Sequence, residues 1–450
     1  MPDLGNIVKA YDIRGIVPDE LDESVARDIG AAFVRVVGAD RIVTAHDMRD
    51  SSPGLARAFA AGATSQGADV VDAGLGSTDM LYFAAGSLGI PGAMFTASHN
   101  PAKYNGIKLC RAGAAPVGQD SGLAEIRAMV EQGIPPYDGE PGTVSERDLL
   151  SDYAAYLVSL VPGVTDIRPL SVAVDAGNGM GGLTAPVVFG HLPVDLVPMY
   201  FELDGSFPNH EANPIEPDNL RDLQAKVRET GADIGLAFDG DADRCFVVDE
   251  KGDLVSPSVL TALIATRELA KEPGATVIYN LITSHAVPEI VAEHGGTAVR
   301  TRVGHSFIKA TMAETNAVFG GEHSGHFYFR DFWRADSGML AALHTLAALG
   351  TQDRPLSSLL AEFSRYVASG EINTRVDDQA ATMAAVEAAY KDRDGVTVDH
   401  LDGMTVALPD GSWFNLRASN TEPLLRLNVE AADETEMTRI RDEVLALLRG

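Results

Sequence analysis

The sequence predicts three consecutive α/β domains of similar pattern, with mixed and largely parallel sheets, followed by a smaller C-terminal α+β domain. Helix and strand signals alternate through three successive segments of the 450-residue chain, which is typical of βαβ units. The last segment instead contains a hairpin pattern between two helices. The length agrees, because about 150 residues per domain gives three domains, or four if one is small.

The first three segments are residues 1–144, 145–253 and 254–367. Their expected strands are short apolar runs, and their expected helices carry apolar residues at three- and four-residue spacing. The expected strands are 41–45, 69–72, 92–95, 171–175, 195–200, 233–238, 245–248, 276–279, 297–301 and 317–320. The expected helices are one through Leu21 and Val36, one opened by Pro53, and those at 149–161, 219–229, 258–270, 286–294 and 306–314.

Turn-forming and helix-capping residues mark the segment boundaries. The Pro- and Gly-rich run 133–142 is predicted to be a linker. Ser145, with Asp148 three residues later, predicts a helix N-cap. The last segment, from residue 368, is expected to contain helix 380–391, strands 404–408 and 413–417 joined through Pro409-Asp-Gly411, and a C-terminal amphipathic helix.

Charge and composition limit the possible partners. Acidic residues outnumber basic ones by 64 to 35, and the net charge of −29 repels nucleic acid and anionic membranes, so we expect neither as a partner. The two cysteines, Cys110 and Cys245, show no metal-ligand spacing. Without a targeting pattern or a long apolar run, we expect a cytoplasmic protein. A phosphorylated substrate would also be repelled, so a phosphate site requires local basic clusters.

A polar loop, Thr96-Ala-Ser98-His99-Asn-Pro101, follows the expected strand 92–95. In open α/β sheets, ligands bind beyond the carboxyl ends of the strands, so Ser98 is a candidate functional residue. A Ser beside a His can be an activated nucleophile, but neighbours on an extended chain point in opposite directions. A simple turn is the alternative, because Ser, Asn and Pro favour turns.

Three carboxylates, Asp239, Asp241 and Asp243, follow the expected strand 233–238 at alternate positions. Mg²⁺ and Ca²⁺ prefer oxygen ligands, and carboxylates this close repel one another without a cation. We therefore predict a site for a hard cation, with a solvated acidic turn as the alternative. A calcium-binding helix–loop–helix is disfavoured, because its sixth position needs Gly and is Arg244 here.

A glycine-rich turn, Gly177-Asn-Gly179-Met-Gly-Gly182, matches the dinucleotide-binding pattern between a strand and a helix. That pattern also needs an acidic residue at the end of the next strand, about 20 residues later. The chain shows no clear candidate there. A tight turn without a nucleotide is therefore the favoured interpretation.

Three later segments could bind an anionic sugar. The run 300–309 holds four potential cations and no acid at a predicted helix N-terminus, where anions bind well. Arg417 offers a planar guanidinium, with small polar donors just after it. The Gly-rich run 320–326 carries Glu322 and Ser324, which could reach vicinal hydroxyls. A solvated helix face and polar turns are the alternatives.

Taken together, the motifs resemble those of the α-D-phosphohexomutases along essentially the whole chain. The matching motifs are YDIRG at 11–15, TASHNP at 96–101, FPNHEANP at 207–214, DGDADR at 239–244, GEHSGH at 321–326 and RASNTEP at 417–423. Asn420 favours the phosphomannomutase/phosphoglucomutase group, since the phosphoglucosamine mutases typically carry Gly there. Two positions depart from the family pattern, His323 for Met and His46 for Arg in His46-Asp-Met-Arg49. We expect neither to touch the chemistry, although His323 leaves the sugar preference open.

The resemblance implies four domains around a central cleft, at 1–144, 145–253, 254–367 and 368–450, each supplying one loop. Ser98 would carry a phosphoryl group and, with the three aspartates, hold Mg²⁺. The implied sugar ligands are Glu322 and Ser324, and the implied phosphate ligands are Arg417, Ser419, Asn420 and Thr421. The other implied cleft residues are Tyr11, Arg14, His99, Lys108, Arg244 and His305, of which His99, Lys108 and His305 could move a proton.

The implied activity is the Mg²⁺-dependent interconversion of mannose 6-phosphate and mannose 1-phosphate, together with the glucose phosphates. It would proceed through a phosphoserine and a hexose 1,6-bisphosphate, with glucose or mannose 1,6-bisphosphate as activator. We expect a monomer or small homo-oligomer. The alternatives are phosphoglucomutase or phosphoglucosamine mutase as the main activity, a Mg²⁺-dependent sugar-phosphate phosphatase, and a non-enzymatic sugar-phosphate-binding protein.

Overall fold

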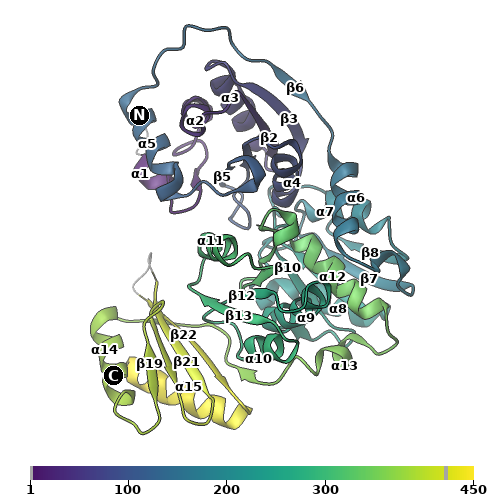
Figure 1. The fold of residues 1–450 in the computed structure, drawn as a ribbon, viewed down its shortest axis with the longest axis vertical. Coiled ribbons are helices and arrows are strands. Elements are labelled where there is room, and N and C mark those ends of the chain that lie inside the picture. The colour runs from purple at the N-terminus through teal and green to yellow at the C-terminus, as the bar shows by residue number, and fades with distance from the viewer. Residues whose placement is uncertain (1–3, 420–423, 450) are drawn as a thin grey trace. The chain divides into compact units, whose positions relative to one another are not determined.

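The structure, a computed structural model, describes residues 4–419 and 424–449 (Figure 1). The chain divides into two compact units. The first unit contains residues 4–257 and 324–357, and the second contains the described residues of 258–323 and 358–449. The chain therefore leaves the first unit, returns to it and ends in the second.

A six-stranded mixed sheet lies in the N-terminal part of the first unit. Its strands are β1 (Ile13–Ile16), β2 (Arg41–His46), β3 (Asp69–Leu75), β4 (Gly92–Phe95), β5 (Tyr104–Cys110) and β6 (Val144–Glu146). The strand order is β1-β5-β4-β2-β3-β6. Strands β4, β2, β3 and β6 are parallel, whereas β5 is antiparallel to β1 and β4. The helices of this part are α1 (Leu4–Ile7), α2 (Glu23–Val37), α3 (Ser52–Thr64), α4 (Thr78–Leu88) and α5 (Leu123–Gln132).

Aromatic packing joins this sheet to its helices. Phe33 of α2 and Phe59 of α3 have ring centroids 5.7 Å apart, and Phe59 lies 5.4 Å from Phe95 of β4. All three rings are buried, which stabilises the sheet through apolar burial and edge contacts. Asp22 caps α2 by accepting a backbone N–H of its first turn. This packing fixes the carboxyl end of β4, after which Ser98 follows.

A second, five-stranded sheet follows in the same unit. Its strands are β7 (Leu170–Asp175), β8 (Val194–Met199), β9 (Ile234–Phe238), β10 (Cys245–Val248) and β11 (Leu254–Val255). The strand order is β11-β10-β9-β7-β8, with β7 parallel to β8 and β9, and β10 antiparallel to its two neighbours. The helices are α6 (Leu150–Leu160), α7 (Gly181–Phe189) and α8 (Arg221–Thr230).

The glycine-rich turn between β7 and α7 uses its backbone donors within the protein. The N–H of Asn178 donates to Tyr200 O at 2.9 Å, and the N–H of Met180 donates to Gly240 O at 2.9 Å. A phosphate would need such N–H groups free. The segment is a tight turn whose backbone donors pair within the protein, in agreement with the favoured interpretation.

The predicted N-cap at Ser145 is wrong. Ser145 lies in β6, which pairs in parallel with β3, and α6 begins only at Leu150. Asp148 provides the local polar contact instead, because its side chain accepts the N–H of Leu150 at 3.0 Å. The pairing with β3 decides the conformation at Ser145, and a local pattern does not contain it.

Residues 324–357 return to the first unit with β15 (Phe327–Phe329), β16 (Ala335–Asp336) and α12 (Gly338–Gly350). Strands β15 and β16 are antiparallel. Every residue of α12 is buried. Short helix α13 (Leu356–Leu360) follows at the unit boundary.

The second unit contains an α/β part and a C-terminal α+β part. The α/β part consists of α9 (Pro257–Lys271), β12 (Thr276–Asn280), α10 (Ala286–Glu293), β13 (Thr297–Thr301), α11 (His305–Thr315) and β14 (Phe319–Gly321). Here β12 is parallel to both β13 and β14.

The C-terminal part is an antiparallel sheet with two helices. Its elements are β17 (Val367–Ala368), β18 (Ile372–Arg375), α14 (Gln379–Tyr390), β19 (Thr397–Asp399), β20 (Met404–Ala407), β21 (Trp413–Ala418), β22 (Leu424–Ala431) and α15 (Glu434–Arg449). The order is β17-β22-β21-β20-β19, with β18 also paired to β22. The expected hairpin is present as β20 and β21, and α15 packs on β22 (Figure 1).

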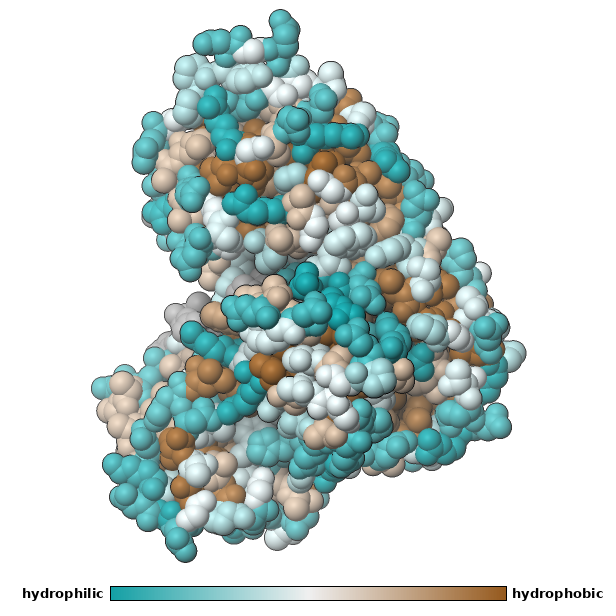
Figure 2. Space-filling model, viewed as in Figure 1, coloured by the Kyte–Doolittle hydropathy of each residue, from teal (hydrophilic) through white to brown (hydrophobic). Residues whose placement is uncertain are grey.

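The hydropathy of the helices and of the surface can be described directly. None of the helices in the described residues is long and apolar enough to cross a membrane. Hydrophilic residues cover much of the visible surface, with hydrophobic residues between them (Figure 2).

Candidate active site

Ser98 lies in the loop after β4 and adopts a left-handed backbone conformation, with φ of 51°. This conformation is uncommon for a residue with a side chain. The backbone N–H of Ser98 donates to Thr96 Oγ1 at 2.9 Å, and its side chain is largely buried. Ser98 Oγ lies 3.1 Å from His99 Nδ1. The expectation that these two side chains point in opposite directions is wrong, because the loop is not extended at Ser98.

The three aspartates predicted to hold a cation lie together in the loop after β9. Asp239, Asp241 and Asp243 are buried, and one oxygen of each lies within 4.8 Å of the others. Ser98 Oγ donates to Asp239 Oδ2 at 2.8 Å, so the two predicted loops meet. Gly240 permits this approach, because a Cβ there would lie 2.4 Å from Ser98 O.

Two cations accompany the aspartates. Lys108 of β5 places Nζ 2.7 Å from Asp241 Oδ2 and 2.6 Å from Asp243 Oδ2. Arg244 donates its Nε–H to Asp239 Oδ2 at 2.9 Å. The structure therefore brings Ser98, His99, Lys108 and Arg244 together with all three aspartates.

The aspartate oxygens fit a hard divalent cation. Oδ1 of Asp241 and Oδ1 of Asp243 are buried without a hydrogen-bond partner among the described residues. Buried carboxylate oxygens are costly unless something compensates their charge. Thr78, at the start of α4, orients Asp241 by donating its hydroxyl to Oδ2 at 2.6 Å. An all-oxygen donor set of this kind suits Mg²⁺ better than a soft metal.

Burial and neighbouring charges shift the pKa values of these groups. Burial raises the pKa of Asp239 above its usual range, aided by Asp243 and opposed by Arg244. Burial would also raise the pKa of Asp243, but Lys108 and His326 together outweigh burial and hold that pKa well below its usual range. Burial, with Arg244, lowers the pKa of His99 to about 2. His99 is therefore a neutral imidazole at ordinary pH.

Ser98 is not arranged as a nucleophile activated by His99. A hydroxyl has one proton to donate, and Ser98 directs it to Asp239. His99 Nδ1 can then interact with Ser98 Oγ only by donating, which requires the tautomer protonated at Nδ1. The hydroxyl therefore faces the acidic loop, where a cation and a phosphoryl group would meet.

His326 also belongs to this site, and we did not predict it as a site residue. Its Nε2 lies 3.6 Å from Asp243 Oδ1 and 4.0 Å from Asp336 Oδ2. Its Nδ1 lies 2.9 Å from Ser324 Oγ, so the imidazole of His326 lies between the predicted Ser324 and Asp243. The second histidine of the GEHSGH motif is the sequence signal that could have identified it.

Arg14 reaches the same region from β1. Its Nη1 donates to Asn100 Oδ1 at 2.7 Å, so it contacts the loop that carries Ser98. Tyr11 is half-buried in the segment just before β1. Both lie in the first unit, with Ser98.

The remaining predicted residues belong to the second unit. Glu322 is buried, and its Oε1 accepts the N–H of Gly304 at 3.1 Å. Arg417 is partly exposed, with Glu371 at 3.9 Å and Asp402 at 3.8 Å. The other predictions here are Ser419, which is buried at the end of β21, His305, which begins α11, and Asn420 and Thr421, which lie outside the described residues.

The predicted basic run 300–309 is only partly available to a ligand. Arg300 donates to Asp399 Oδ2 at 2.6 Å and to Thr405 Oγ1 at 3.0 Å. The guanidinium of Arg302 lies 4.7 Å from the centroid of the Phe307 ring. Arg300 therefore links two parts of the second unit, and the prediction of four potential cations in this run did not take Asp399 into account.

Comparison with known proteins identifies the family of the chain. Four family models match: phosphoglucomutase/phosphomannomutase alpha/beta/alpha domain I at residues 5–135, domain II at 151–252, domain III at 256–366, and the C-terminal domain at 371–447. The chain belongs to the phosphoglucomutase/phosphomannomutase family. The predicted resemblance is thereby confirmed, as is the order of three α/β domains and a C-terminal domain.

Several members of the family resemble the chain over nearly their full length. It is 44% identical to a protein of Xanthomonas campestris pv. campestris named phosphohexose mutases, covering 98% of this chain and 99% of that protein. A phosphomannomutase of Escherichia coli is 39% identical, covering 98% of each. A solved structure of a phosphoglucomutase/phosphomannomutase family protein from Burkholderia thailandensis has a TM-score of 0.89 at 35% identity, covering 100% of this chain and 98% of that one.

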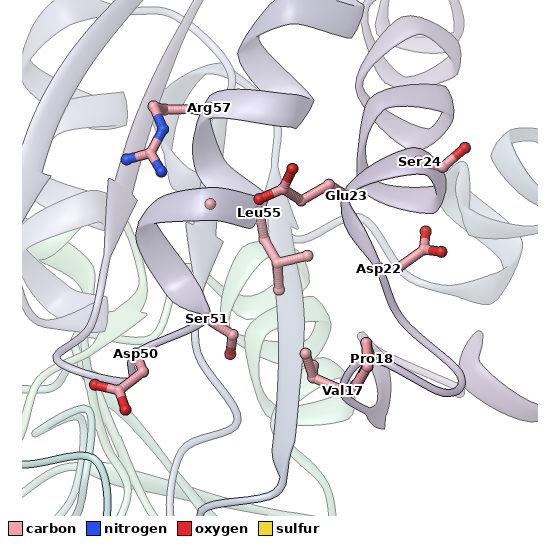
Figure 3. A pocket seen from close by; sticks show the side chains of 10 residues that line it. Val17, Pro18, Asp22, Glu23, Ser24, Asp50, Ser51, Leu55 and Arg57 are labelled. Carbon is pink, nitrogen blue, oxygen red and sulfur yellow. The ribbon is translucent and has the colours of Figure 1, made fainter.

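A separate groove lies where α2 and α3 begin (Figure 3), with a volume of about 460 Å³. Three carboxylates line it, those of Asp22, Glu23 and Asp50, together with one cation, Arg57. None of the candidate active-site residues lines this groove. Its acidic lining disfavours a phosphate ligand.

Proposed function

We propose that the chain is a phosphohexomutase that interconverts mannose 6-phosphate and mannose 1-phosphate, and also the corresponding glucose phosphates. The observation that carries the proposal is the hydroxyl of Ser98 facing three buried aspartates and Arg244. Relatives with these activities in their names support it, including the phosphomannomutase of Escherichia coli and a phosphoglucomutase of Neisseria gonorrhoeae that is 37% identical over 453 residues.

Ser98 acts as a phosphate carrier in this proposal. In the transfer, the bond between phosphorus and Ser98 Oγ breaks as the free hydroxyl oxygen of the substrate bonds to phosphorus. The substrate hydroxyl gives its proton to a base, and Ser98 Oγ regains a proton. The hexose 1,6-bisphosphate that forms then returns its other phosphoryl group to Ser98. His99, Lys108 and His305 are the candidates for moving the proton.

Asp239, Asp241 and Asp243, together with Ser98, would hold Mg²⁺. The metal would supply positive charge to the transferred phosphoryl group. Arg244 is placed to stabilise the same charge, since its guanidinium already binds Asp239 beside Ser98. Glucose 1,6-bisphosphate or mannose 1,6-bisphosphate would prime the enzyme by phosphorylating Ser98.

The rest of the proposed site binds the substrate in either orientation. The proposed phosphate ligands are Arg417, Ser419, Asn420 and Thr421, the proposed sugar ligands are Glu322 and Ser324, and Tyr11 and Arg14 complete the cleft. We include in the proposal four domains divided after residues 144, 253 and 367, with the fourth as a lid. The enzyme would act in the cytoplasm on small hexose phosphates, as a monomer or small homo-oligomer.

Replacement of the carrier residue tests the proposal. Ser98→Ala should lose all but a few per cent of the turnover of mannose 1-phosphate, and should not be labelled by glucose 1,6-bisphosphate. A Ser65→Ala variant, which changes a half-buried serine at the end of α3, should still be labelled. Ser98→Ala that retains turnover would refute the phosphoserine mechanism. Stoichiometric release of inorganic phosphate by the wild type would favour a phosphatase.

Relative kcat/KM values decide the sugar preference. Mannose 1-phosphate, glucose 1-phosphate and glucosamine 1-phosphate should be compared under one set of conditions. We expect the first two to be used and the third to be poor. A dominant activity on glucosamine 1-phosphate would overturn the proposed specificity.

A further inference from the structure

Arg49 is buried in the segment between β2 and α3 and uses every donor of its guanidinium. Nε–H donates to Asp47 Oδ2 at 3.2 Å, and only 2% of the residue is exposed. The four remaining N–H groups donate to backbone carbonyls: Nη1 to Pro101 O at 3.1 Å and Tyr104 O at 2.9 Å, and Nη2 to Ser98 O at 2.8 Å and Asn100 O at 2.7 Å. A guanidinium has five N–H donors, so none is left for a substrate.

Three of the four carbonyls belong to the loop between β4 and β5 that carries Ser98, and the fourth, that of Tyr104, belongs to the first residue of β5. Backbone bonds within this segment run from Asn100 N–H to Ala97 O and from Tyr104 N–H to Pro101 O, and Ser98 has a left-handed φ. One of the bonds is made directly to the carbonyl of Ser98. The planar guanidinium therefore acts as a template that holds the loop at several points, and the orientation of Ser98 Oγ depends on that backbone.

Two residues of the segment that follows β8 also contact Arg49. The ring of Phe207 lies with its centroid 5.1 Å from the guanidinium carbon. Gly205 approaches so closely that a Cβ there would lie 2.6 Å from Arg49 Cα. Asp47, itself fully buried, accepts the backbone N–H of Arg49 at 3.0 Å. These contacts restrict the orientation of the Arg49 guanidinium.

The buried ion pair of Arg49 and Asp47 indicates that Arg49 sets the conformation of the loop more than it adds stability. A buried ion pair is a costly way to gain stability, because both charges lose their hydration. Five directional hydrogen bonds, however, define a loop conformation that a lysine could not reproduce, since its ammonium has three donors and no planar fork. Arg49 belongs to the His46-Asp-Met-Arg49 segment, in which we had expected the departure at His46 to leave the chemistry untouched.

We propose that Arg49 is a positioning residue for phosphoryl transfer, which fixes the backbone of Ser98 so that Oγ faces the aspartate loop. This inference rests on the proposed phosphoserine function. Arg49 itself has no donor left for substrate, so its loss should affect the transfer step and leave substrate binding nearly unchanged.

Arg49→Lys tests this role, with Arg35→Lys as the matched control. Arg35 also donates from one guanidinium to two loop carbonyls, Pro135 O and Pro136 O, both at 3.0 Å, but far along the chain from Ser98. In Arg49→Lys, kcat for mannose 1-phosphate and the rate of Ser98 phosphorylation by glucose 1,6-bisphosphate should fall about 100-fold, as expected for a misplaced reacting group. KM should change little, and Arg35→Lys should match the wild type.

Several results would overturn the inference. Wild-type kcat in a folded Arg49→Lys protein, an equal loss in Arg35→Lys, or a higher KM at unchanged kcat would each do so. If Arg49→Lys does not unfold cooperatively on heating, Gly205→Ala takes its place, because its methyl group pushes on Arg49 Cα. Gly205→Ala must then lower kcat at similar KM. Activity of Ser98→Ala would instead refute the proposed function itself.

Discussion

Replacement of Asp79 by Asn should remove a defined part of the pH dependence of stability. Asp79 is fully buried in the first turn of α4. It accepts hydrogen bonds from Ser77, from Tyr153 of α6 at 2.7 Å and from Ser337, the N-cap of α12, at 2.6 Å. Burial nevertheless raises the pKa of Asp79 to about 6.

The two pKa values give the expected magnitude. The folded value of about 6 exceeds the ordinary value of 3.8, so the folded state binds the proton more tightly than the unfolded chain. Protonation of Asp79 therefore stabilises the fold below pH 3.8, and this contribution is lost as the pH rises through 6. The full contribution is about 3 kcal/mol at 1.36 kcal/mol per pH unit, and about 1.4 kcal/mol of it separates pH 5.0 from pH 7.5.

Urea unfolding of both proteins at pH 5.0 and 7.5 measures this difference. Trp333 is a suitable reporter, because its ring lies 6.4 Å from Phe83 of α4 and 5.2 Å from Tyr156 of α6. A Trp413→Phe background in both proteins leaves that single tryptophan emitting. The wild type should gain about 1.4 kcal/mol more than Asp79→Asn on acidification. Equal gains in the two proteins would show that Asp79 does not titrate in this range.

Three further predictions concern the metal and the phosphate. Lys108→Met should bind Mn²⁺ about tenfold more tightly in a calorimetric titration, because the ammonium that bridges Asp241 and Asp243 no longer competes with the metal; weaker binding would contradict this. Thr78→Val should weaken Mn²⁺ binding about tenfold in the same titration through loss of the hydroxyl that orients Asp241, and unchanged affinity would exclude that role. Arg417→Ala should chiefly raise KM for mannose 1-phosphate, and an unchanged KM in steady-state assays would remove it from the phosphate site.

The sequence predicted the elements well where local patterns decide them. Runs such as 41–45 and 171–175 are strands, and α2 has the expected apolar face, because burial selects the same periodicities that a sequence displays. The predicted helix N-cap at Ser145 was wrong because the conformation of Ser145 depends on pairing with β3, more than 70 residues earlier. Long-range pairing leaves no signal in a short window.

In the candidate site, too, the sequence predicted what local patterns decide and missed what long-range contacts decide. The residue types at strand ends identified Ser98 and the three aspartates as chemically able. The conformation of Ser98 was not predictable, because left-handed φ at a serine is set by surrounding structure. Arg49 and His326 were missed as functional residues for the same reason, since their roles arise from contacts with other loops.

Charge balance explains why the site combines acidic and basic residues in so acidic a chain. Three cations around Ser98 each already bind a carboxylate: Lys108 and Arg244 bind the aspartate loop, and Arg49 binds Asp47. A phosphoryl group on Ser98 would add −1.5 to −2 charges at neutral pH. The charge of these cations is already offset by their carboxylate partners, so they would balance the phosphoryl charge only in part. A phosphoserine here would therefore favour added positive charge, and Asp241 Oδ1, a buried oxygen without a hydrogen-bond partner among the described residues, is where a divalent cation could supply it.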